Sequence, residues 1–135
     1  MSATNLDLIT SALRKLNVID ETEAPSAEQG VQGLAAVNDM MADMYADGIR
    51  LGWFPQTDLS ATAPIADENI RGVKYLLTVE LGGEYDLQVP QYVLTTAANA
   101  YARLAKGSQQ YFEASMDGLP MGDAQYGWGW GWPFA

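Results

Sequence analysis

The chain has 135 residues, with 17 acidic side chains against 7 basic ones, a net charge of −10, and neither cysteine nor histidine. This length suits one domain with a buried core, and 48% hydrophobic against 18% charged residues excludes an intrinsically disordered chain. Without cysteine there is no disulfide framework and no thiolate metal site. The acidic balance argues against wrapping nucleic acid, which requires clustered lysine and arginine.

The N-terminal half predicts two amphipathic helices. The first runs from about Asn5 to Leu16, with Thr4 as N-cap, and its apolar face carries Leu6, Ile9, Leu13 and Leu16. The second begins after Ser26, where Gln29 completes a capping box. Its apolar positions recur every three or four residues, at Val31, Leu34, Val37, Met40, Met41, Met44 and Tyr45. Gly48, followed by Ile49, predicts a Schellman-type stop, and the apolar pair Trp53 and Phe54 is expected to cover the end of the bundle.

The second half predicts a crossover and two more helices. Residues 55–66 have no helical period and read as an extended crossover or short strand. Asp67 is the expected cap of a third helix that ends at Gly82-Gly83, with Ile70, Val73, Leu76, Leu77 and Leu81 facing inward. Pro90, at the first helical position, opens a fourth helix through Leu104 and on toward Met116, with Gly107 as a point of kinking. The predicted fold is an all-α bundle of about four helices with an extended crossover loop and an extended C-terminal tail.

In the last ten residues every second position from Tyr126 to Phe134 is aromatic, and the positions between them are glycine apart from Pro133. In an extended segment one face would carry all the rings, which belong to Tyr126, Trp128, Trp130, Trp132 and Phe134. Exposed aromatic surface of this kind marks an interaction site. Two interpretations stay open, docking on another subunit and folding back on the same domain. We therefore expect a helical domain over residues 1–116 and a docking tail over residues 117–135.

Charged residues form one acidic row and three basic pairs. Asp39, Asp43 and Asp47 follow at i, i+4 and i+8 on the second helix, where like charges work against the helix. This row predicts either contact with basic groups of a neighbouring subunit or a channel wall, or simply a solvated face. The basic pairs are expected as three separated spots that set the register of salt bridges between subunits. They are Arg14/Lys15, Arg71/Lys74 and Arg103/Lys106.

Catalytic chemistry has little support in the sequence. The usual nucleophile–base pairs need histidine or cysteine, and neither a phosphate-binding loop nor an EF-hand pattern occurs. A carboxylate pair for glycoside hydrolysis is defined by distance and cannot be judged from spacing. We expect no catalytic residue, no metal and no cofactor. No apolar run approaches the ~20 residues of a transmembrane helix, and residues 1–5 do not resemble a signal peptide, so a cytosolic origin is expected.

Two stretches resemble a known family. Residues 13–19, Leu-Arg-Lys-Leu-Asn-Val-Ile, and residues 40–49, Met-Met-Ala-Asp-Met-Tyr-Ala-Asp-Gly-Ile, are similar to the tail accessory factors of short-tailed bacteriophages. These are also called packaged-DNA stabilisation or head-completion proteins. The resemblance covers about residues 6–54. Asn17 stands where the family usually has glycine, and asparagine also tolerates the left-handed conformation.

The resemblance implies a structural head-to-tail adaptor of the virion, assembled in the host cytoplasm. Its copies, twelve by analogy with the family, would form a ring under the portal protein, extend the DNA channel and carry the next tail or nozzle protein. DNA would pass without specific binding, and no membrane is involved. Two alternatives stay open from the residues: a virion-associated, carboxylate-dependent peptidoglycan hydrolase, and a monomeric helical binding module.

Overall fold

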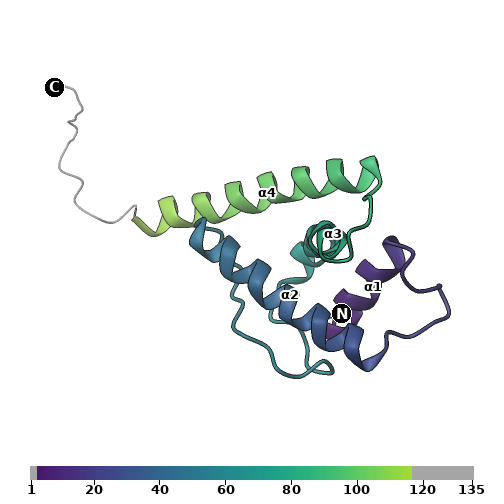
Figure 1. Cartoon of the computed structure of the whole chain (residues 1–135). Helices are drawn as coiled ribbons and strands as arrows, with labels where there is room; N and C mark the ends of the chain where they lie inside the picture. Colours follow the sequence, from purple (N-terminus) through teal and green to yellow (C-terminus); the bar gives the residue numbers. More distant parts are fainter. Residues whose placement is uncertain (1–2, 117–135) are drawn as a thin grey trace.

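The computed structural model describes residues 3–116, and over this range the protein is all-α, as predicted (Figure 1). The four helices are α1 (Asn5–Lys15), α2 (Ala27–Ala46), α3 (Asp67–Glu84) and α4 (Gln91–Met116). Within residues 3–116 there is no strand, and the crossover between α2 and α3 makes one isolated bridge, Thr4 with Thr62. None of the helices in this part of the chain is long and apolar enough to cross a membrane.

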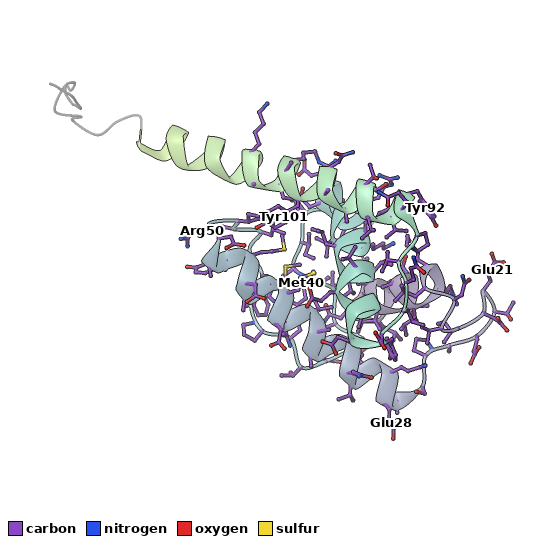
Figure 2. All side chains as sticks on the ribbon, turned by 45° about the horizontal axis from the view of Figure 1, so that its top comes forward. Glu21, Glu28, Met40, Arg50, Tyr92 and Tyr101 are labelled. Atoms are coloured by element: carbon purple, nitrogen blue, oxygen red, sulfur yellow. The ribbon has the colours of Figure 1, made fainter. Side chains whose placement is uncertain are left out.

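Helix α3 is the centre of the bundle. It packs against each of the other three helices, whereas α4 packs on α3 alone. Figure 1 shows α4 along one side of α3, and α1 and α2 on the other. The core is apolar, and Figure 2 shows Met40 pointing from α2 into the space between the helices. Its fully buried large side chains include Leu8, Ile9, Leu13, Val37, Val73, Leu77, Leu81 and Val93.

Helices α1 and α2 begin after the N-cap residues predicted from the sequence, Thr4 and Ser26. At α1, the Thr4 side chain accepts a hydrogen bond from the Asp7 N–H, and the Asp7 carboxylate accepts one from the Thr4 N–H. Ser26 and Gln29 exchange the same pair of bonds at α2. The N-cap predicted at Thr4 and the capping box predicted at Ser26 are confirmed, and the bond to Asp7 makes a second capping box at Thr4. These bonds satisfy N–H groups that have no partner within the helix.

Three helices end in the same way, with a left-handed residue after the C-cap. The residue is Asn17 (φ 60°) after α1, Gly48 (φ 91°) after α2 and Asp86 (φ 56°) after α3. The next N–H then bonds back to the last turn, as Ile49 does to the Met44 carbonyl at 2.9 Å. The stop predicted at Gly48 is confirmed. Asn17 takes the left-handed conformation expected of a glycine substitute.

The predicted boundaries of α3 and α4 were wrong in detail. Ala66 is the N-cap of α3 without a side-chain bond, and Asp67 is the first helical residue. Gly82 and Gly83 lie inside α3 rather than after it; a Cβ on Gly82 would collide with Val89, so this glycine serves close packing. Helix α4 begins one residue after Pro90 and continues as a single helix past Gly107.

Several residues predicted to face inward are exposed. Val31 is 67% exposed, Tyr45 57% and Leu6 36%, and Phe54 does not cover the bundle end because it is 61% exposed. The reason at α2 is the position of its glycines. Gly30 meets Leu59 of the crossover and Gly33 meets Ile9 of α1. Because α2 turns this glycine side toward the bundle, Val31 is left on the outside.

Candidate interaction surfaces

The acidic row on α2 is divided by the fold. Asp39 and Asp43 are exposed on α2. Asp47, the C-cap residue, instead accepts a hydrogen bond of 2.7 Å from the hydroxyl of Tyr101 on α4. This bond, followed by partial burial and the negative charge of Asp47, raises the pKa of Tyr101. This hydrogen bond therefore connects the end of α2 to α4. Among the described residues, the carboxylates of Asp39 and Asp43 have no such contact with α4 and are exposed to solvent.

Two of the basic pairs meet, which corrects the prediction of three separated spots. Lys15 at the end of α1 and Arg71 on α3 both lie against the ring of Tyr75, each with its charged group 5.0 Å from the ring centroid. Lys74 is close enough to act on Lys15 through its charge. Helices α1 and α3 pack together along this side. We call Lys15, Arg71, Lys74 and Tyr75 the basic-aromatic patch.

In the basic-aromatic patch, the positive charges of Lys74 and Arg71 act on the Lys15 ammonium. Partial burial lowers the pKa of Lys15 below its ordinary value of 10.5, and the positive charges of Lys74 and Arg71 lower it further. The Lys15 ammonium also donates to the Ser11 hydroxyl at 2.9 Å. An anion bound here would relieve the repulsion among the three cations.

The remaining basic residues lie elsewhere. Arg103 and Lys106 are exposed on α4, and the guanidinium of Arg103 lies over Gly72 of α3. Arg14 donates to the Glu23 carbonyl at 3.2 Å, which holds the connector between α1 and α2.

This connector and α1 line an open groove of mixed charge, with residues that include Arg14, Lys15, Lys74, Asp7, Asp20 and Glu21. In the part of the chain described, no cluster of acidic residues could hold a metal ion.

The crossover is fixed by a network of amide side chains that sequence reasoning missed. Asn38 of α2 donates to the Gln56 carbonyl at 2.9 Å and accepts from the Gln56 N–H at 3.0 Å and from the Trp53 indole at 3.1 Å. The buried side chain of Asn5 donates to the Gln56 side chain at 3.0 Å and to the Asp58 carbonyl at 2.9 Å. The crossover is thus bonded to both α1 and α2.

This network presents Phe54 to solvent on a fixed backbone. The two residues that Asn38 holds, Trp53 and Gln56, lie on either side of it, and the Gln56 side chain donates to the carbonyl of Phe54 itself at 2.9 Å. The ring is nevertheless 61% exposed. An exposed aromatic side chain on a preorganised backbone is typical of an anchor for a protein partner.

Phe54 borders an exposed face of α2. Val31, Ala35 and Ala42 lie along this face at helical spacing, and Asn38, which holds the crossover, lies on the same side. Asp39 and Asp43 flank it. We call Val31, Ala35, Asp39, Ala42, Asp43 and Phe54 the α2 outer surface. Farther along, the guanidinium of Arg50 lies 4.2 Å from the ring centroid of Tyr45, and Figure 2 shows Arg50 pointing away from the bundle.

The five aromatic residues of the predicted docking tail, Tyr126, Trp128, Trp130, Trp132 and Phe134, lie outside the described residues. Their role and the division of the chain at residue 117 therefore remain predictions.

Comparison with known proteins agrees with the resemblance stated from the sequence. The family model for the P22 tail accessory factor matches residues 1–126, nearly the whole chain. A search of curated proteins finds no match. A family match of this extent, on a bundle whose helix ends agree with the predicted caps and stops, identifies the chain as a member of the P22 tail accessory factor family.

Proposed function

We propose that this protein is a head-to-tail adaptor, whose copies form a ring under the portal protein, extend the DNA channel and carry the next tail protein. Membership of the family makes the chain a structural protein of the bacteriophage tail. The observation that carries the proposal is the family match over residues 1–126. The exposed surfaces described above supply what a ring subunit needs, because they give it separate contact regions on different helices.

The tail is the proposed contact with the portal or with a neighbouring copy. Five aromatic side chains occupy every second position of residues 126–134, with three glycines and Pro133 between them. Each aromatic side chain buries ~150–250 Å² when covered. Together they would bury on the order of 1,000 Å², comparable to one side of a standard protein interface. Burial of these side chains against a partner would therefore supply the area that a stable interface needs.

The charge distribution supports a channel that does not hold DNA. The net charge is −10, and the three cations that line the open groove, Arg14, Lys15 and Lys74, share it with the carboxylates of Asp7, Asp20 and Glu21. Phosphate binding strengthens with each neutralised charge. A predominantly acidic wall therefore lets DNA pass during packaging and ejection.

The proposal is tested by sedimentation velocity of the full chain, alone and mixed with the portal ring of its phage. We expect several copies to join the ring, and the tail tryptophans to become protected from a fluorescence quencher. Changing Trp128, Trp130 and Trp132 to serine should abolish joining. Changing Leu94 to serine, which removes one exposed apolar side chain of α4 outside the tail, is a control for nonspecific loss of apolar surface and should leave portal binding in place. A chain that never joins the portal, with its tryptophans already protected, would contradict the proposal and favour a monomeric binding module.

A further inference from the structure

We propose that the α2 outer surface of one copy binds the basic-aromatic patch of the next copy. This inference rests on the proposed function, because it names the two faces through which ring subunits would meet. The two surfaces differ in chemistry and lie on different helices. A contact between two different patches is heterologous, and repeated heterologous contacts produce a closed ring or an open filament.

The two surfaces face different directions. Helix α2 packs its buried side on α1 and α3, so its exposed side, with Val31 and Asp39, is directed away from both helices. The basic-aromatic patch is carried by α1 and α3 themselves. One copy therefore cannot bring its own two surfaces together, and a contact between them would join two molecules.

Their charges are complementary. Asp39 and Asp43 are exposed one turn apart on α2, and Arg71 and Lys74 are spaced three residues apart on α3. Burial lowers the pKa of Lys15, and the positive charges of Lys74 and Arg71 lower it further. Carboxylates brought in by a second copy would offset the repulsion among these charges. Since the chain has 17 acidic residues against 7 basic ones, this patch is also a scarce feature on an acidic molecule.

Their apolar parts are complementary as well. The α2 outer surface has apolar and small side chains at its centre, and Phe54 is held in place on its edge. The basic-aromatic patch has the half-buried ring of Tyr75 between its cations. Apolar contact at the centre with charged pairs around it is the usual anatomy of a protein interface. The phosphates of DNA would pair with the cations of the patch, but DNA binding would not account for the exposed apolar residues of the α2 outer surface.

Charge reversal tests the contact. In one variant Asp39 and Asp43 become lysine; in a second, Arg71 and Lys74 become glutamate. We expect either reversal to weaken self-association, alone or on the portal, by about tenfold or more, and the combination of both in one chain to restore it. The control is Lys106→Glu, the reversal of an exposed cation farther along α4, which should leave self-association unchanged.

A cross-link gives a second readout that does not depend on affinity. The chain has no cysteine, so a D43C/K74C variant forms a disulfide only through introduced residues. Oxidation should give a ladder of covalent oligomers, whereas D43C/K106C should not. If copies join the portal but reversals have no effect and no ladder forms, this interface is wrong while the adaptor function stands. If the ladder forms and reversal disrupts it without any portal binding, the interface stands and the adaptor function fails. A chain that stays monomeric in both settings contradicts both.

Discussion

Replacing Asn38 with alanine tests whether one side chain holds the crossover on α2. Asn38 makes one hydrogen bond as donor and two as acceptor, with Gln56 and Trp53. A typical hydrogen bond contributes ~0.5–1.5 kcal/mol net, so the three together predict a loss of about 1.5–4.5 kcal/mol in the free energy of unfolding. The substitution should also loosen the backbone that carries Phe54.

Urea denaturation followed by tryptophan fluorescence measures this loss. The chain has 4 tryptophans, and changing Trp128, Trp130 and Trp132 to phenylalanine leaves Trp53 as the single reporter. In the alanine variant Trp53 loses its indole partner, so its native emission should also change. The control is Asn99→Ala, an exposed position on α4, which should stay within about 0.5 kcal/mol. A loss below about 0.5 kcal/mol at Asn38, with unchanged Trp53 emission, would refute the assigned role.

Two further predictions concern packing and pH. Gly33→Ala should cost about 1–3 kcal/mol in urea denaturation, because its Cβ would lie 2.6 Å from the Cγ2 atom of Ile9. Gly83→Ala, a helical position with open space around it, should instead stabilise by about 0.5–1 kcal/mol; equal effects at the two glycines would contradict the packing described. Tyr101→Phe should cost about 0.5–1 kcal/mol at neutral pH. Because the bond to Asp47 raises the pKa of Tyr101 above 10.0, its contribution is complete below pH 10 and is lost as the pH rises through the folded-state pKa. The gap between wild type and Tyr101→Phe should therefore shrink above pH 10, and a gap that stays constant to pH 11 would count against this bond.

Helix ends were predictable where the chemistry is local. A capping box needs only residues three apart, so Thr4 and Ser26 could be recognised from the sequence alone. Gly48 and Asn17 were recognisable for the same reason, since both residue types tolerate positive φ. The end of α3 was not predictable in this way. Gly82 looks like a helix breaker in sequence, but in the fold it lets Val89 and Leu16 pack against the helix.

Surfaces were harder to predict because they depend on which helices meet. Lys15 and Arg71 are far apart in the chain, and only the packing of α1 on α3 places both at Tyr75. The amide network is equally invisible in sequence, since Asn5, Asn38 and Gln56 belong to no recognisable motif. The acidic row, in contrast, was predicted from spacing. Its last member, Asp47, was found to bond within the chain because α4 passes beside the end of α2.

The packing of α2 on α1 at Gly33 also sets the angle between the two proposed contact surfaces, which a measurement of stability does not test. In a ring of heterologous contacts, an angular error between the two surfaces of a subunit is repeated at every step, so closure demands a rigid path between them. Here that path runs from the α2 outer surface through the contact of Gly33 with Ile9 into α1, and from α1 to the basic-aromatic patch at Lys15. A side chain added at Gly33 would push α2 away from α1 and change the angle between the two surfaces. Given the proposed contact, Gly33→Ala should therefore convert closed rings into open or irregular oligomers under conditions where the variant is still folded.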